Sequence, residues 1–140
     1  MAGAPVEALL RVPLFADLNK REAKEVARLF KERRFSAGET VVQTGSGGAA
    51  FFVIDSGEAI VVVAGKERAT LKPGDYFGEI ALIDEGTRTA TITATTELVC
   101  YGLTHWDFRP LVEANGRIGW KLLQSMAKML RTASSPAGEA

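Results

Sequence analysis

Short runs of β-branched and aromatic residues, separated by glycine-containing turns, fill the middle of this 140-residue chain. The turn signals recur about every eight to twelve residues, a spacing typical of a β-sandwich or jelly roll. The pattern therefore predicts an antiparallel β core. The predicted strands are residues 40–43, 50–54, 59–63, 67–71, 90–94 and 98–103.

Helical periodicity flanks this β region on both sides. Asn19 and Glu22 have the spacing of a capping box and precede apolar residues at helical intervals, which predicts an N-terminal helix. Thr104 and Asp107 predict the start of a second helix, which an Asn-Gly pair ends. A single apolar stripe predicts an amphipathic last helix over residues 117–131.

These elements predict a mainly β fold, a double-stranded β-helix or jelly roll with an N-terminal helix and two C-terminal helices. The length fits one domain. We expect that domain to span residues 1–131. Residues 132–140 are small, polar and proline-bearing, which predicts a disordered tail.

Composition narrows the possible functions. The 17 basic residues balance 17 acidic ones, so no overall positive charge favours nucleic acid. No apolar run approaches the roughly 20 residues of a membrane span, and the N-terminus lacks the pattern of a secretory signal. We therefore expect a cytoplasmic protein that binds neither nucleic acid nor membrane.

Residues for metal or catalytic chemistry are scarce. Cys100 is the single cysteine and lies in an apolar stretch, which favours a buried small side chain over a redox or metal role. His105 is the single histidine, whereas a metal-binding β-barrel generally needs several. The sequence carries no nucleophile elbow and no P-loop. We expect no catalytic residues, no metal and no enzymatic activity, and we expect His105 to start a helix.

The segment FGEIALIDEGTRTAT, residues 77–91, carries the pattern that indicates a ligand site. Gly78 permits backbone conformations that a β-carbon forbids, and one helical turn after it would direct free N–H groups toward an anion. The planar guanidinium of Arg88 can meet two phosphate oxygens together. A carboxylate beside a phosphate suits a hydroxyl donor, so Glu79 is a candidate for binding a ribose 2′-OH.

This segment resembles the phosphate-binding cassette of the cyclic nucleotide-binding domain family, found in catabolite-activator-type regulators, kinase regulatory subunits and gated ion channels. The resemblance covers roughly residues 12–130 and includes the segments 13–15, 35–40 and 51–57. The departures are the turn at 45–49, where the family often carries aspartates, and a short hairpin at 64–66.

The resemblance implies that Glu79 holds the ribose 2′-OH and that Arg88 pairs with a phosphate oxygen. Thr89 stands where a hydroxyl in some members contacts the phosphate and the amino group of guanine, so both cAMP and cGMP stay open as ligands. No other cofactor is implied. The ligand-binding residues implied by the resemblance are Phe77, Gly78, Glu79, Ile80, Ala81, Arg88, Thr89 and Ala90.

The family also implies that the last helix closes over the base, where Leu122, Leu123 or Met126 would meet the purine. Signalling would follow from this repositioning of the C-terminal helices. A protein effector, or self-association through the last helix, would supply the output. The alternative is a jelly-roll interaction module that has lost nucleotide binding or binds another small anion.

Overall fold

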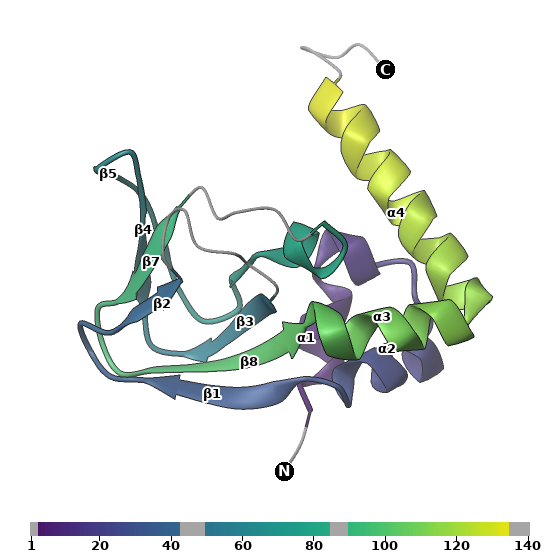
Figure 1. The fold of residues 1–140 in the computed structure, drawn as a ribbon, viewed down its shortest axis with the longest axis horizontal. Coiled ribbons are helices and arrows are strands. Elements are labelled where there is room, and N and C mark those ends of the chain that lie inside the picture. Colours follow the sequence, from purple (N-terminus) through teal and green to yellow (C-terminus); the bar gives the residue numbers. More distant parts are fainter. Residues whose placement is uncertain (1–2, 43–49, 85–89, 135–140) are drawn as a thin grey trace.

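The computed structural model describes residues 3–42, 50–84 and 90–134, and within these ranges the strands form two antiparallel sheets (Figure 1). One sheet has the strand order β1-β8-β3-β6 and the other β2-β7-β4-β5. The strands are β1 (Lys31–Phe35), β2 (Thr40–Val42), β3 (Ala50–Ser56), β4 (Ala59–Val63), β5 (Lys66–Leu71), β6 (Tyr76–Phe77), β7 (Thr91–Ala94) and β8 (Leu98–Thr104).

The six predicted strands are confirmed as β2, β3, β4, β5, β7 and β8, while β1 and β6 were not predicted. The sequence of β1, KERRF, lacks apolar alternation because this edge strand is largely exposed on both faces. Its pairing with β8, from Lys31 opposite Gly102 to Phe35 opposite Leu98, makes it a strand. Charged side chains on an edge strand also discourage pairing with other chains.

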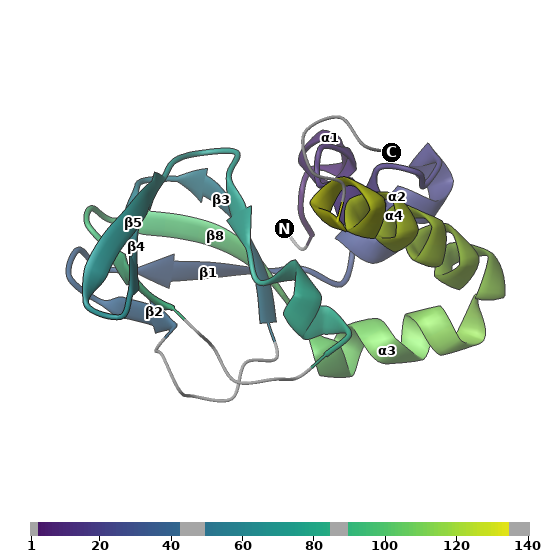
Figure 2. The same ribbon diagram turned by 90° about the horizontal axis from the view of Figure 1, so that it is seen from above.

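Helices gather at one end of the two sheets (Figure 2). The N-terminal group is α1 (Val6–Leu10), the 3₁₀ helix η1 (Pro13–Phe15) and α2 (Lys20–Ala27), and the C-terminal pair is α3 (His105–Ala114) and α4 (Gly116–Ser134). A further 3₁₀ helix, η2 (Glu79–Leu82), follows β6. The predicted mainly β fold, with helices before and after the strands in the sequence, is thus confirmed, although α1 was not predicted.

Capping interactions place the helix starts where the sequence predicted them. The Asn19 side chain accepts from the Glu22 N–H at 2.9 Å, and the Glu22 carboxylate accepts from the Asn19 N–H at 2.9 Å. The Thr104 hydroxyl accepts from the Asp107 N–H at 3.2 Å. Helix α4 ends at Ser134 rather than at Arg131, and residues 135–140 lie outside the described ranges.

Strand β3 divides the apolar interior into two cores. Phe51 and Val53 enter a core shared with the helices, and Phe52 and Ile54 enter a core between the two sheets. Successive side chains of a strand point to opposite faces, so one strand supplies both cores. Cys100 is fully buried in the inter-sheet core, as predicted, and burial raises the pKa of its thiol to about 11.

The helices of the described ranges include none that is both long and apolar enough to cross a membrane. Within the same ranges, no cluster of three or more His, Cys, Asp or Glu side chains is placed to hold a metal ion.

Two glycines in turns provide a matched test of backbone constraint. Gly57 has φ +89° and a β-carbon there would lie 2.1 Å from the Glu97 carbonyl oxygen, whereas Gly65 has φ +79° with nothing within 4 Å. We predict that Gly57→Ala lowers the free energy of unfolding by about 3 kcal/mol or more and Gly65→Ala by about 1 kcal/mol. Urea unfolding of both variants measures the difference, and equal losses would contradict the predicted clash.

Candidate ligand-binding site

Strand β6 fixes the start of the predicted cassette. Phe77 pairs with Phe52 of β3, and their rings stack with centroids 5.2 Å apart. Phe77 also packs against the inter-sheet core. The aromatic side chain therefore anchors the backbone from which Gly78 and the following turn emerge.

Gly78 takes the left-handed conformation that the sequence predicted a glycine to supply. Its φ is +86°, and it is the N-cap of η2. The predicted single turn after it is confirmed as η2, with the Ala81 N–H donating to the Gly78 carbonyl at 3.0 Å. A residue with a β-carbon would strain this turn.

Glu79 is a half-buried carboxylate at the start of η2. Burial raises the pKa of this carboxyl, and a hydrogen bond from its own backbone N–H opposes the rise. The pKa of the neighbouring Tyr76 phenol is raised by burial, by the charge of Glu79 and by that of Asp75. A partly desolvated carboxylate of this kind gains from a hydroxyl donor that replaces lost water.

The other predicted ligand residues divide by location. Ile80 projects outward and is exposed, whereas Ala81 is buried against the protein. Ala90 is partly buried at the entrance to β7. Arg88 and Thr89 lie outside the described residues. The structure therefore brings five of the predicted residues together, Phe77, Gly78, Glu79, Ile80 and Ala81, on one continuous β6–η2 segment.

A histidine contact joins η2 to α3. His105 Nδ1 lies 2.7 Å from the Leu82 carbonyl oxygen, and because a carbonyl only accepts, Nδ1 carries the proton. Leu82 is buried in the helix-side core, and His105 is buried as the first residue of α3. The sequence analysis correctly placed His105 at a helix start but missed this contact, since 23 residues separate the two partners.

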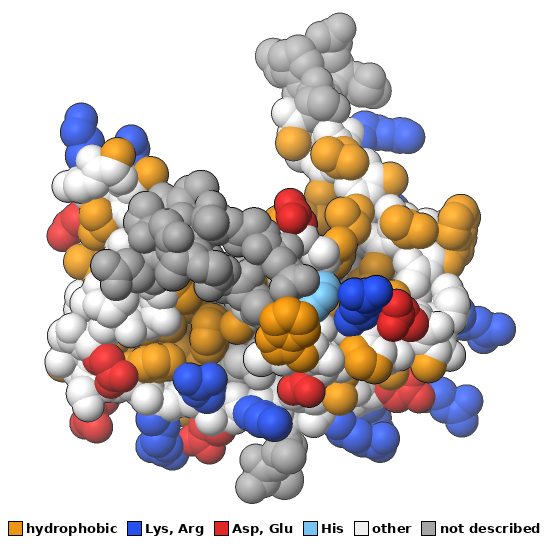
Figure 3. Space-filling model, viewed as in Figure 1, with side chains coloured by type: hydrophobic (Ala, Val, Ile, Leu, Met, Phe, Trp, Pro, Cys, Tyr) orange, Lys and Arg blue, Asp and Glu red, His pale blue; other side chains and the backbone are white. Residues whose placement is uncertain are grey.

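An apolar groove of about 420 Å³ runs from the end of η2 to the C-terminal helices. Hydrophobic side chains gather along the α4 surface in Figure 3. Leu122 is only 4% exposed and packs in the core, whereas Leu123 is 58% exposed and lines the groove with the partly buried Met126. The groove is lined by Ile83, Phe108, Val112, Gly116, Gly119, Trp120, Leu122, Leu123 and Met126.

The fold and the site together define a jelly-roll domain in which a glycine-led turn lies beside a pair of C-terminal helices. The sequence profile of the cyclic nucleotide-binding domain matches residues 32–115 of this chain. The chain therefore belongs to the cyclic nucleotide-binding domain family.

Individual relatives agree with this membership. The chain is 41% identical over 92 residues to the cAMP-dependent protein kinase regulatory subunit of Yarrowia lipolytica, covering 64% of this chain and 24% of that subunit. It spans about a quarter of the length of the curated relatives it matches.

Solved structures show the same fold. The N-terminal domain of a transcriptional regulator from Streptomyces coelicolor A3(2) matches with a TM-score of 0.83 and 31% identity, covering 91% of this chain and 94% of that one. The catabolite activator protein of Thermus thermophilus matches with a TM-score of 0.68 and 30% identity, covering 86% of this chain and 59% of that one.

The His105 contact can be tested by replacing the ring. Asparagine places a donor close to the position of Nδ1, whereas leucine fills the space and leaves the Leu82 carbonyl without this donor. We predict that His105→Leu lowers the free energy of unfolding by about 2 kcal/mol and that His105→Asn loses less. Chemical unfolding measures both, and a leucine variant more stable than the asparagine variant would show that ring volume matters more than the hydrogen bond.

Proposed function

We propose that this chain is a non-catalytic sensor that binds a cyclic nucleotide monophosphate. The observation that carries the proposal is the β6–η2 segment, where a left-handed Gly78 opens a short helix that begins with the half-buried Glu79. This segment lies inside the region that matches the cyclic nucleotide-binding domain.

The phosphate would bind beside the start of η2 and meet Arg88. The backbone of Gly78, Ile80 and Ala81, with that of Ala90, supplies donors near the phosphate, and Arg88 supplies the opposite charge. The assignment of Arg88 and of Thr89 rests on the sequence pattern. The Ala81 N–H already donates within the turn at 3.0 Å, so it would share this bond with a phosphate oxygen.

Glu79 would accept a hydrogen bond from the ribose 2′-OH. Its partial burial gives an ionised carboxylate little water, so a hydroxyl donor stabilises the charge. A ribose hydroxyl lies next to the cyclic phosphate in these ligands. Glu79 and Arg88 would therefore recognise adjacent parts of one molecule.

The C-terminal helices would carry the signal. Trp120 is 63% exposed and Leu123 is 58% exposed on α4, and both line the groove that begins at Ile83. Movement of α4 over the bound ligand would remove these side chains from water, which favours a closed state. Leu123 is the best placed of the three residues considered for contact with the purine, because it is exposed, whereas Leu122 is buried and Met126 is partly buried.

cAMP is the first ligand to test because the Yarrowia lipolytica relative is named a cAMP-dependent regulatory subunit. That name also makes a protein effector the first partner to seek. Thr89 leaves cGMP as the second ligand. Self-association through α4 is the other route to an output, since its exposed apolar side chains suit a partner helix.

Titration calorimetry with cAMP and cGMP tests the proposal directly. We expect the wild-type protein to bind at least one nucleotide and Arg88→Ala to bind it about 100-fold more weakly, because a charge-assisted pair with the phosphate is lost. The matched control is Arg109→Gln, which changes an exposed arginine on α3 that pairs with Glu113. No binding of either nucleotide at millimolar concentration would favour the interaction module, and normal binding by Arg88→Ala would overturn that residue's role.

The proposed role of Glu79 predicts that the affinity for the nucleotide depends on pH. The raised pKa means that the carboxyl takes up its proton above the ordinary value of 4.5, so affinity should fall as the pH decreases through that raised value. We expect Glu79→Gln to bind about tenfold more weakly near neutral pH and to show a flat profile down to about pH 5. Parallel titrations across this range measure both, and the same acid loss in Glu79→Gln would assign the titration to another group.

A further inference from the structure

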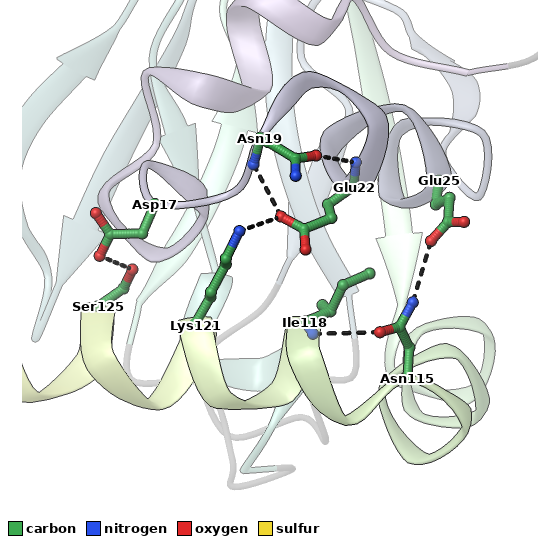
Figure 4. Close-up of polar contacts among 8 residues, drawn as sticks. All are labelled: Asp17, Asn19, Glu22, Glu25, Asn115, Ile118, Lys121 and Ser125. Atoms are coloured by element: carbon green, nitrogen blue, oxygen red, sulfur yellow. Dashed lines mark hydrogen bonds and ion pairs between the residues drawn. The ribbon is translucent and has the colours of Figure 1, made fainter.

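Polar contacts attach α4 to the N-terminal helices along one side (Figure 4). Lys121 Nζ lies 2.7 Å from Glu22 Oε1, and Ser125 Oγ donates to Asp17 at 3.0 Å. Lys128 Nζ lies 3.0 Å and 3.1 Å from the two Asp17 oxygens. We call these five residues the polar clamp.

Glu22 is the most constrained member of the polar clamp. Glu22 is only 5% exposed, and its Oε1 atom accepts hydrogen bonds from both the Asn19 N–H and the Lys121 ammonium group. Burial favours the neutral carboxyl, but the hydrogen bonds from Lys121 and Asn19 outweigh it and lower the pKa of Glu22. Removing Lys121 alone would leave a buried charge with one partner fewer, which is costly.

Asp17 forms the second half of the clamp, close to η1. Hydrogen bonds from Lys128 and Ser125 lower the pKa of this carboxyl. Ser125 is buried, whereas the ammonium group of Lys128 is on the surface. Glu22 therefore holds α4 at Lys121. Asp17 holds it at Ser125 and Lys128, about one and two helical turns further along.

The groove side of α4 has the opposite character. Trp120 and Leu123 are exposed there. On the clamp side, Ser125 and the Glu22 side chain that Lys121 contacts are buried. Burial of the apolar side chains would be favourable on its own. The observed position of α4 thus retains ion pairs to the N-terminal helices and leaves apolar surface in water.

We propose that the polar clamp sets the apparent affinity for the cyclic nucleotide by stabilising the position of α4 that leaves the groove open. This inference rests on the proposed function. If only the released form closes over the ligand, the apparent dissociation constant equals the intrinsic value divided by the fraction of molecules that are released. Contacts far from the cassette would then weaken binding without touching the ligand.

The test removes both halves of one ion pair while keeping the capping box. Lys121→Met retains the aliphatic stem, and Glu22→Gln retains an oxygen for the Asn19 N–H. We expect the double variant to bind the nucleotide about three- to tenfold more tightly than wild type by titration calorimetry. Arg109→Gln breaks an ion pair within α3 and serves as the control, with unchanged affinity expected.

A second measurement follows α4 without any ligand. Spin labels at Lys66→Cys on β5 and Thr132→Cys on α4 report the distance between the sheets and the helix, and Cys100 is buried away from the label. We expect the double variant to shift or broaden this distance distribution relative to wild type. Thermal unfolding of each variant confirms that the domain is folded.

The two measurements separate the possible failures. Equal affinities in wild type and the folded double variant, with binding that depends on Arg88, would overturn the clamp and leave the proposed function intact. Absence of nucleotide binding in wild type would overturn the proposed function. The clamp's role in affinity would then fail with it, and the label distance would show separately whether these ion pairs hold α4 in place.

Discussion

Phe51 and Phe52 are neighbours on β3, and their rings enter different cores. Phe51 contacts Phe15 and Phe30 on the helical side, with ring centroids 5.8 Å apart in both pairs. Phe52 stacks on Phe77, which immediately precedes Gly78. Strand alternation therefore connects the packing of the N-terminal helices to the position of the cassette, because one rigid strand is shared by both.

Two contacts of different kinds join the described part of the cassette to the C-terminal helices. The hydrogen bond from His105 to the Leu82 carbonyl ties the end of η2 to α3, and an apolar groove extends from Ile83 to α4. The polar clamp attaches the other side of α4 to α2 and to the turn between η1 and α2. Ion pairs stabilise the observed position of α4, whereas a position that buried the exposed apolar side chains would be stabilised by the hydrophobic effect, and the proposed response to a ligand needs two such positions.

Local signals predicted much of the fold and of the cassette. The capping box at Asn19, the cap at Thr104 and the glycine-led turn at Gly78 were all predicted, because each depends on residues a few positions apart. The contacts of His105 and of Lys121 were not predicted. Their partners are 23 and 99 residues away, and no local pattern encodes which distant groups will meet.

The sequence by itself determined the continuous apolar run that lets β3 bury both its faces, the turns between strands and the residue types of the cassette. Tertiary structure alone decided that the charged segment Lys31–Phe35 is an edge strand, because its pairing with β8 replaces the apolar pattern it lacks. It also decided which side of α4 is buried. Leu122 and Leu123 are chemically identical and both line the groove, and only the packing of α4 against the rest of the domain buries Leu122 in the core and leaves Leu123 exposed.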